Sequence, residues 1–412
     1  MSLNMGVEIE VPSHFLCPIS MQLMRDPVTI STGITYDRVS IERWLFTCLS
    51  RICPMTKQPL YDTDLTPNHT LRRLIQSWCI MNSHHGFDRI PTPKKPVDKS
   101  QILKLLQDAK KHPQNQIKCL RRMRSIAQSS DRNKTCMEDS GAVEFLTTVV
   151  LNEDGSDACN EALIVLHHLK FTDLQMRKLV KDNELGFVDA LLRVMRCGSI
   201  QSRSHAIMLI RSLLEVADPV HMAAIKPDLF QETVRVLKDG ISPQTTKASL
   251  ELVVDILRWG RNRIKAAESG MVSVLVELLI DTCDRRGCEL MLVALEQICR
   301  CAEGRAKLVE HAAGLATVSK KILRVSHMAS DKAVRIVCLV CRFSASCRVV
   351  QEMVEVGVVS KLCLMIQVDC SERTKERVKQ ILGLHSRVWK GASCIPAHLL
   401  SSYPSLQDIK DH

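Results

Sequence analysis

Two short segments near the N-terminus place a cysteine directly before a proline, and cysteine thiolates are common zinc ligands. The segments read HFLCPISMQLMRDP (14–27) and RICPMTKQPL (51–60), and two such loops are typical of a zinc-bound module. Two zinc sites of four ligands each need more Cys and His than this region offers. No C-x-x-C pair occurs in it, so we predict a module that holds no metal. The candidate ligands are His14, Cys17, Cys48, Cys53, His69 and Cys79.

The chain also lacks the residue patterns of a cysteine nucleophile and of a phosphate-binding loop. Cys17 and Cys53 have no neighbouring His with an acid to orient it, which a cysteine nucleophile needs. The chain has no glycine-rich phosphate loop of the P-loop or kinase type. Its C-x-x-C pair, CLVC at 338–341, lies in an apolar helical stretch, where core packing explains it best. We therefore expect no conventional active site and no cofactor.

Short strands, turns and two helices are expected to position the Cys-Pro loops within residues 11–82. The stretch TGITYD (32–37) predicts a turn followed by a strand. RVSIERWLFTCL (38–49) predicts a helix that follows Asp37 as its N-cap. PNHTLRRLIQSWCIMN (67–82) opens with a helix-start signal and has apolar residues along one side.

The composition of the chain is that of a helical protein. Of its 412 residues, 45% are hydrophobic and only 4% are aromatic, which disfavours strands. No run of about 18 apolar residues occurs, so we expect no transmembrane helix. The N-terminus lacks the basic and apolar regions of a secretory signal. The 18 cysteines are scattered, as expected for reduced core residues of a cytosolic protein.

Helical patterns beyond residue 100 repeat about every 42–45 residues. In each repeat an apolar helix, such as KPDLFQETVRVL near Asp228, precedes a second one, such as ASLELVVDIL (248–257). A period of this length built from helices alone predicts armadillo or HEAT units, stacked into an α-solenoid with a long concave binding surface. The glycine that follows a short helix, such as RNRIKAAES (261–269), and precedes the apolar helix favours the three-helix armadillo form. We expect a stiff Pro-rich linker over 83–99, the solenoid over 100–390 and a tail over 391–412. The repeats are marked near Gly141, Gly186, Asp228, Gly270, Gly314 and Gly357.

The net charge of +11 raises the alternative of a nucleic-acid partner. The densest basic cluster, KCLRRMRS (118–125), contains apolar residues that mark it as one face of an amphipathic helix. The chain also lacks stacking aromatics and a basic stripe, so we expect no nucleic-acid binding. An importin-like receptor is a further alternative. Such receptors place Asn four residues after Trp, and neither Trp259 nor Trp389 is followed by Asn at that spacing.

Residues 11–82 carry a long match, in order, to a known family. The match rests on VPSHFLCPISMQLMRDPVTISTGITYDRVSIERWL and, further on, CPMTKQPLYDTDLTPNHTLRRLIQSW. These stretches resemble the U-box of ubiquitin ligases, specifically the plant group in which armadillo repeats follow the U-box. The U-box is similar in fold to a RING finger without its zinc sites. The resemblance implies a mostly α chain, with a small α+β U-box followed by an armadillo-type α-solenoid.

The resemblance implies that hydrogen bonds and salt links replace the metal of a RING finger. Short polar residues can tie down loop backbone in this way. Which of them pair with one another is not readable from the sequence. The candidates for this structural network are Asp26, Asp37, Arg38, Thr56, Asp64, Asn68 and Thr70.

In the family, a ubiquitin-conjugating enzyme (E2) docks between the two loops and the central helix. Carried over to this chain, Ile19 and Met21 are the apolar contacts of the first loop, and Pro54 is that of the second. Trp44 faces the same groove from the central helix. Lys57 lies where related domains place a cation that contacts both E2 and ubiquitin. Ile19 and Trp44 could instead be core residues, Pro54 a turn former, and Lys57 a solvated charge.

The resemblance therefore implies an E3 ubiquitin ligase that forms no covalent intermediate. Its expected partners are an E2, ubiquitin and a protein substrate on the concave face of the repeats. A homodimer is left open. The alternative is a scaffold with a degenerate U-box, which the presence of Ile19, Trp44 and Pro54 argues against. The resemblance also implies a cytoplasmic protein, with nuclear or peripheral membrane pools not excluded, that acts in plant stress and defence signalling.

Overall fold

The computed structural model describes residues 10–48, 50–85, 87, 97–152, 156–169, 171, 176–177, 186–282 and 284–389. The chain divides into two compact units, residues 1–170 and 171–412. The boundary between them falls inside the predicted solenoid. The predicted tail, 391–412, and most of the predicted linker lie outside the described residues.

Unit 1 begins with a small antiparallel sheet whose strand order is β2–β1–β3. The strands are β1 (Pro27–Thr29), β2 (Thr35–Asp37) and β3 (Thr66–Pro67). In the register of this sheet, Val28 pairs with both Tyr36 and Pro67. Gly33, in the turn between β1 and β2, has φ of 82°, which only glycine adopts without strain. The predicted turn and strand at 32–37 are therefore confirmed.

Short helices surround the sheet. They are η1 (Ser13–Phe15), α1 (Arg38–Glu42), the π-helical turn η2 (Arg43–Thr47), α2 (His69–Met81) and η3 (Ser83–His85). The helix predicted over 38–49 begins as expected but changes to π-helical geometry at Arg43. Asn68 caps α2, because its side-chain oxygen accepts a hydrogen bond from the Leu71 N–H.

One apolar core holds these elements together. It includes Tyr36 from the sheet, Ile41 from α1 and Ile75 from α2, all buried. Cys17 and Cys53 are fully buried members of the same core. Both Cys-Pro loops are therefore anchored in the interior of this domain.

Further helices follow in the described part of unit 1. They are α3 (Lys99–Lys111), α4 (Pro113–Ser129), α5 (Asp131–Glu138), α6 (Ala142–Asn152) and α7 (Asp157–His168). Helices α4 and α7 pack against each other. Arg121 and Arg124 of α4 both pair with Glu161 of α7.

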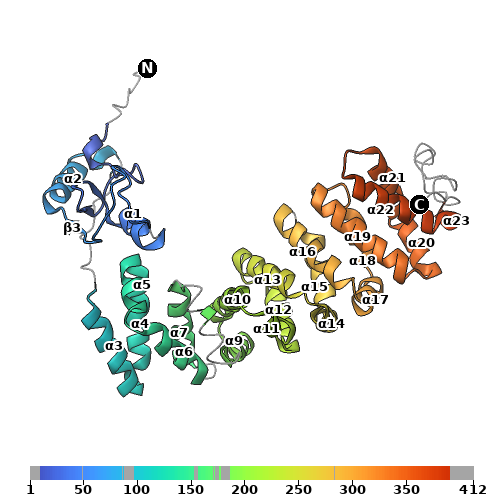
Figure 1. The fold of residues 1–412 in the computed structure, drawn as a ribbon, viewed down its shortest axis with the longest axis horizontal. Coiled ribbons are helices and arrows are strands. Elements are labelled where there is room, and N and C mark those ends of the chain that lie inside the picture. Colours follow the sequence, from blue (N-terminus) through green and yellow to red (C-terminus); the bar gives the residue numbers. More distant parts are fainter. Residues whose placement is uncertain are drawn as a thin grey trace. The chain divides into compact units, whose positions relative to one another are not determined.

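Unit 2 is a helical array whose helices follow one another in the order of the sequence (Figure 1). Its described helices are α9 (Gly186–Cys197), α10 (Ile200–Glu215), α11 (Pro219–Ala223), α12 (Pro227–Asp239), α13 (Pro243–Ile256), α14 (Gly260–Glu268), α15 (Met271–Asp281), α16 (Arg285–Ile298), α17 (Ala302–Glu310), α18 (Gly314–Lys321), α19 (His327–Phe343), α20 (Cys347–Glu355), α21 (Val358–Gln367), α22 (Glu372–Leu384) and α23 (Ser386–Trp389).

These helices form repeats of three helices, for example α14, α15 and α16. Gly141, Gly270 and Gly357 each join the first helix of a repeat to the second, with φ of 77°, 85° and 73°. Only glycine adopts such left-handed geometry readily. The three-helix repeat predicted from these glycines is confirmed, and with it the predicted fold class.

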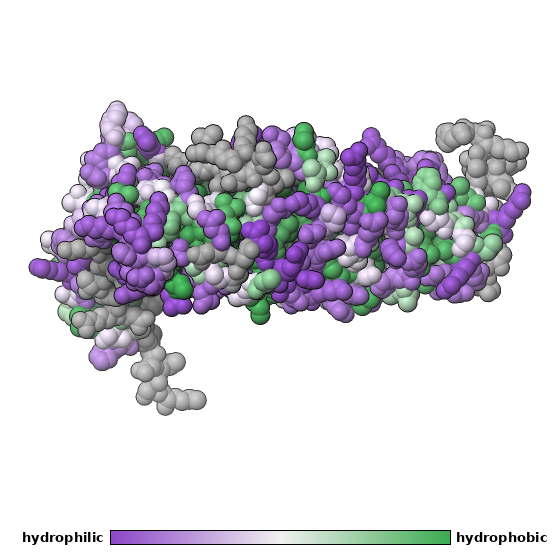
Figure 2. Space-filling model, turned by 90° about the horizontal axis from the view of Figure 1, so that it is seen from below, coloured by the Kyte–Doolittle hydropathy of each residue, from purple (hydrophilic) through white to green (hydrophobic). Residues whose placement is uncertain are grey.

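The third helices of successive repeats lie side by side in unit 2, in the order α10, α13, α16, α19 and α22 (Figure 1). On the face seen in Figure 2, hydrophilic residues cover most of the surface and hydrophobic ones appear in small separate patches. The apolar sides of the helices are therefore largely used in stacking. In the described part of the chain, no helix is both long enough and apolar enough to cross a bilayer.

Candidate functional site

The two Cys-Pro loops, Cys17–Gln22 and Cys53–Gln58, have the same backbone hydrogen bonds. The Cys17 N–H donates to the Gln22 carbonyl at 2.8 Å, and the Cys53 N–H donates to the Gln58 carbonyl at 2.8 Å. Isolated antiparallel bridges, Leu16 with Leu23 and Ile52 with Pro59, close the two loops. The site is therefore built from two copies of one loop motif.

Each loop contains one non-glycine residue with left-handed backbone geometry. Met21 has φ of 55° and Lys57 has φ of 59°. Their N–H groups donate to the carbonyls of Cys17 and Cys53, at 2.8 and 3.0 Å. This geometry costs about 1–2 kcal/mol per residue, so these bonds and the rest of the loop must hold it. Both side chains are exposed at equivalent positions of the two loops.

The sulfurs of both loop cysteines accept hydrogen bonds. Cys17 Sγ accepts from the Asp37 N–H at 3.3 Å. Cys53 Sγ accepts from the Thr56 N–H and the Thr32 hydroxyl, both at 3.4 Å. Burial raises the pKa of the Cys53 thiol, but hydrogen bonds from Thr32, Thr56 and Tyr36 outweigh it and lower the pKa to about 6.

Burial and hydrogen bonding also have opposite effects on the pKa of Cys17 in the first loop. Burial raises the pKa of the Cys17 thiol, and hydrogen bonds from the backbone of Ser20, Asp37 and Ile19 reverse the effect, so the pKa is lowered. In both loops the donors thus favour negative charge on the sulfur, as a bound cation would.

Two consecutive residues, Tyr36 and Asp37, hold the two loops. The Asp37 N–H bonds to the sulfur of the first loop. The Tyr36 hydroxyl lies 3.3 Å from Cys53 Sγ and accepts a hydrogen bond from the Met55 N–H at 3.2 Å. Because neighbouring residues of β2 bind one loop each, the end of this strand fixes the two loops close to each other.

The predicted polar network is centred on Asp26, Asp37 and Arg38. The Asp37 carboxylate accepts hydrogen bonds from the N–H groups of Arg25 and Asp26, at 2.8 and 2.9 Å. It lies at the N-cap position of α1 without bonding to that helix. Arg38 Nε donates to the Asp26 carboxylate at 2.6 Å. These bonds connect the segment after the first loop to the start of α1.

The other predicted network residues lie further along the chain. The Thr56 hydroxyl is 3.5 Å from the Gln58 N–H, and the Asn68 amide is 3.5 Å from the Thr35 hydroxyl. The Asp64 N–H donates to the Asp62 carboxylate, while its own side chain is exposed. Thr70 is exposed in the first turn of α2. Asn68 thus links α2 to the sheet, and Asp64 and Thr70 lie at the surface.

The predicted E2-binding residues are presented by both loops and by η2. Ile19 and Trp44 are half-buried and pack partly against the core. Met21 is 72% exposed on the first loop, and Pro54 is half-buried on the second. Ile52 and Met55 are also exposed beside Pro54, although neither was predicted from the sequence as an E2 contact. Their exposure could not be read from the sequence, because apolar residues in a small domain are more often core.

Trp44 also makes a polar contact with the second loop. Its indole Nε1–H donates to the Ile52 carbonyl at 2.8 Å. The side chain is therefore both a partly exposed apolar surface and a tie between η2 and the loop that contains Cys53.

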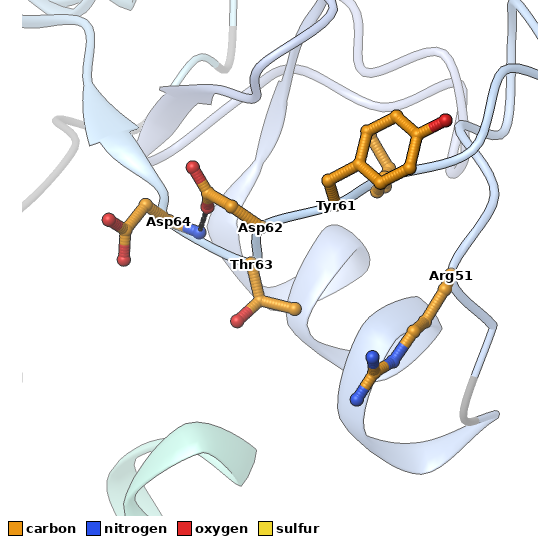
Figure 3. A pocket seen from close by; sticks show the side chains of 6 residues that line it. Arg51, Tyr61, Asp62, Thr63 and Asp64 are labelled. Atoms are coloured by element: carbon orange, nitrogen blue, oxygen red, sulfur yellow. Dashed lines mark hydrogen bonds between the residues drawn. The ribbon is translucent and has the colours of Figure 1, made fainter.

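A shallow pocket of about 320 Å³ lies next to the second loop (Figure 3). Its lining is mostly polar and includes the Arg51 guanidinium and the carboxylates of Asp62 and Asp64. The Tyr61 side chain is almost fully exposed. This pocket is suited to polar contacts rather than to an apolar anchor. Within the described residues, no group of three or more His, Cys, Asp or Glu side chains is arranged to hold a metal ion.

Glu42, at the end of α1, makes a contact with α5 that was not predicted from the sequence. It is 2% exposed, and one carboxylate oxygen accepts a hydrogen bond of 2.5 Å from the hydroxyl of Ser130, the N-cap of α5. Its other carboxylate oxygen lies 3.8 Å from Arg38 Nη1. Burial raises the pKa of this carboxyl, although Ser130, Arg38 and Arg132 act in the opposite direction. Within unit 1, Glu42 thus joins α1 to the first repeat.

Two family descriptions match the chain. "U-box domain" matches residues 11–84, and "Plant U-box protein ARM repeat region" matches residues 101–405. Together they cover the Cys-Pro loops, the sheet and the helical repeats.

Similar proteins from Arabidopsis thaliana match over nearly their whole length. E3 ubiquitin-protein ligase PUB23 is 49% identical over 97% of this chain and 98% of its own length. E3 ubiquitin-protein ligase PUB22 is 44% identical over 97% of this chain and 100% of its own. E3 ubiquitin-protein ligase PUB24 is 35% identical, with 97% of each chain covered.

The helical repeats also resemble a solved structure from work on the phosphorylation switch that controls the interaction between cadherin and beta-catenin. The TM-score is 0.57 and the identity 14%, over 79% of this chain and 58% of the other. At this identity the likeness concerns the fold alone.

Proposed function

The chain belongs to the plant U-box proteins with an armadillo repeat region and is a U-box-type E3 ubiquitin ligase, and from this premise we propose how its residues bind the E2. The E2 docks on the surface formed by loop Cys17–Gln22, loop Cys53–Gln58 and η2. Ile19, Met21, Trp44 and Pro54 supply its apolar anchors.

The observation that carries this proposal is the attachment of both loops to Tyr36 and Asp37. A small interface gains most of its affinity from a few well-positioned anchors, so their relative placement must be fixed before binding. The sulfur-centred hydrogen bonds and the Trp44–Ile52 bond supply that rigidity without metal. The exposure of Ile52 and Met55 enlarges the apolar area available to the E2.

Lys57 is proposed as the cation that contacts both E2 and ubiquitin. It is exposed, and its left-handed backbone is held by the Lys57 N–H bond to the Cys53 carbonyl. The direction in which its side chain leaves the loop is therefore fixed by the loop. As an ammonium it gives a less directional contact than an arginine would.

The proposed chemistry forms no bond to this chain. The amine of a substrate lysine attacks the carbonyl of the E2–ubiquitin thioester, an amide forms, the carbon–sulfur bond breaks, and the E2 cysteine leaves as thiolate while the amine gives up its proton. The U-box accelerates the step by holding the loaded E2 in conformations open to attack. The repeats hold the protein substrate and raise its concentration near the thioester.

A scaffold with a degenerate U-box is less consistent with the site. A U-box that had lost E2 binding would have no need for apolar side chains at the loop surface, yet Met21, Ile52 and Met55 are all exposed there. The resemblance also supports two finer proposals, a cytoplasmic location and a role in plant stress and defence signalling.

Reconstitution with E1, a panel of E2 enzymes, ubiquitin and ATP tests the proposal. The full chain is expected to assemble ubiquitin on itself with at least one E2, and Ile19→Ala is expected to abolish this. A matched control is Val39→Ala, which removes an exposed apolar side chain of α1 outside the proposed anchors. Full activity of Ile19→Ala with every E2 that serves the parent chain would show that the anchors are wrongly assigned.

A further inference from the structure

Helices α13 and α16 of unit 2 lie side by side (Figure 1). An open pocket of about 600 Å³ is lined by residues from their N-terminal ends. The turn before α13, from Gly240 to Ser242, lines one side of it. Leu278 and Thr282, at the end of α15, line the other side. Its volume falls within the range of about 300–1,000 Å³ that is usual for ligand sites.

The floor of this pocket is apolar. Leu250 of α13 and Leu290 and Met291 of α16 line it, and each is less than a tenth exposed. Leu278 is half-buried at its side. An apolar side chain placed against this floor would leave water without displacing a polar group.

Polar contacts join several of the third helices near their N-terminal ends. Where α10 meets α13, the Ser204 hydroxyl bonds to that of Thr245 at 2.6 Å. Where α19 meets α22, the Thr374 hydroxyl donates to Asp331 at 2.9 Å. In these two pairs, the fifth residue of one helix meets the third residue of the next. Between α16 and α19, the fifth residue, Glu289, instead accepts a hydrogen bond from the hydroxyl of Ser326, the N-cap of α19, at 2.8 Å.

Where α13 meets α16, the fifth residue of α13 is Lys247 and the third residue of α16 is Gly287. Glycine has no side chain to offer as a partner, and both residues line the pocket instead. The Gly287 N–H donates to Asp284, the N-cap of α16, at 2.6 Å. A side chain at this position of α16 would meet the Asp284 carboxylate, since a Cβ on Gly287 would lie 2.8 Å from Asp284 Oδ2.

The rim carries positive charge. Lys247 of α13 and Arg286 of α16 line the pocket and are exposed. The Asp284 carboxylate on the rim is engaged by the N–H groups of Arg286 and Gly287. Lys321 Nζ donates a hydrogen bond to the Thr282 carbonyl at 3.3 Å. Arg286 also lies 3.6 Å from Glu289, so Lys247 is the stronger candidate for an outside partner.

We propose that this pocket binds an acidic protein segment that places one Leu- or Met-sized side chain against Leu250, Leu290 and Met291 and a neighbouring carboxylate near Lys247 and Arg286. The inference rests on the proposed function, because it names the kind of substrate segment that the repeats hold. A protein segment fits better than a nucleic acid, since the floor is aliphatic and has no aromatic side chain on which a base could stack.

The test begins with a display library of short random peptides selected on the purified full chain. Enriched peptides are expected to share an apolar residue with Asp or Glu within a few positions. One such peptide, synthesised with a photo-crosslinker at its apolar residue, is expected to label α13 and α16. Binding is expected to weaken about tenfold or more in Lys247→Glu/Arg286→Glu and in Thr246→Trp, which fills the pocket from its half-buried edge.

The matched control is Arg261→Glu/Lys307→Glu, which reverses two exposed cations of α14 and α17 outside the pocket and is expected to bind like the parent. Helical content and melting temperature identify any variant that fails to fold. Labelling elsewhere, enrichment of basic peptides, or unchanged binding by both folded pocket variants would overturn the inference. Self-ubiquitination, which needs no bound segment, is measured separately, so failure of the pocket and failure of the ligase function are distinguishable.

Discussion

The indole N–H of Trp44 donates to the carbonyl of Ile52 at 2.8 Å, so the central helical turn is bonded to the second Cys-Pro loop. A residue predicted from the sequence as an E2 contact is thus also part of the frame that holds the E2 surface. Loss of its apolar surface and loss of its hydrogen bond have different consequences, and they can be separated.

Trp44→Phe is expected to weaken E2 binding only a few-fold, because it keeps an apolar ring and loses one hydrogen bond of about 0.5–1.5 kcal/mol. Trp44→Ala is expected to lose about 2 kcal/mol or more, as anchors of small interfaces do. Isothermal titration of the full chain with an E2 measures both. Equal, parent-like affinities in the two variants would remove Trp44 from the interface.

The Cys53 thiol should make the stability of its loop depend on pH. Its pKa is lowered to about 6 from the ordinary value of 9.0, so the thiolate is favoured in the folded loop. The extra stability is fully present above pH 9 and is lost as the pH falls through about 6. Hydrogen exchange at the Cys53 and Lys57 amides, corrected for intrinsic rates, measures it.

In that experiment, the loop of the parent chain should be more stable than that of Cys53→Ser at high pH, and this difference should shrink as the pH is lowered. Cys48→Ser, at an exposed cysteine, is the control and should follow the parent at every pH. A constant difference between the parent and Cys53→Ser would mean that the thiol does not ionise in this range.

The Glu42 carboxyl should make the stability of the chain fall, rather than rise, with increasing pH. Burial raises the pKa of its carboxyl above the ordinary value of 4.5, so the folded state favours the protonated form. Relative to Glu42→Gln, the parent should lose stability as the pH rises through the interval between 4.5 and the raised value. Glutamine can still accept the Ser130 hydrogen bond, so Glu42→Gln should be at least as stable as the parent at neutral pH.

Thermal unfolding at a series of pH values measures this difference. Glu144→Gln, at an exposed carboxylate of α6, is the control and should show no such trend. If the parent gained stability over Glu42→Gln with rising pH, the burial of Glu42 against α5 would be contradicted.

Gly270→Ala should destabilise the repeats by about 1–2 kcal/mol, because the residue has φ of 85° between α14 and α15. Gly260→Ala is the matched control, since a Cβ there meets nothing within 4 Å and the backbone is not left-handed. Thermal unfolding of the full chain compares them. Equal melting temperatures for the two variants would show that the left-handed turn is not required.

Features with local signals could be predicted from the sequence. Asn68 caps the helix whose start the sequence marks, and Gly141, Gly270 and Gly357 form turns that need glycine. The change to π-helical geometry at Arg43 has no such signal, so the helix predicted over 38–49 was too regular.

Contacts between distant residues could not be predicted in this way. The Tyr36–Cys53 and Glu42–Ser130 contacts join residues far apart in the chain, and neither residue type reveals its partner. The pocket at α13 and α16 likewise brings together residues from separate repeats, such as Lys247 and Gly287. The roles of Ile19, Met21, Pro54 and Lys57 toward an E2 stay predictions.

The central claim is that the two sulfur-anchored loops activate a ubiquitin-loaded E2 without covalent participation of this chain. Its most direct test is the rate at which a purified, loaded E2 transfers ubiquitin to free lysine in the presence of the full chain. The account predicts clear acceleration by the parent chain, loss of that acceleration in Ile19→Ala, and no thioester on any cysteine of the chain. Equal acceleration by the parent and Ile19→Ala, or a reducible ubiquitin adduct on this chain, would contradict it.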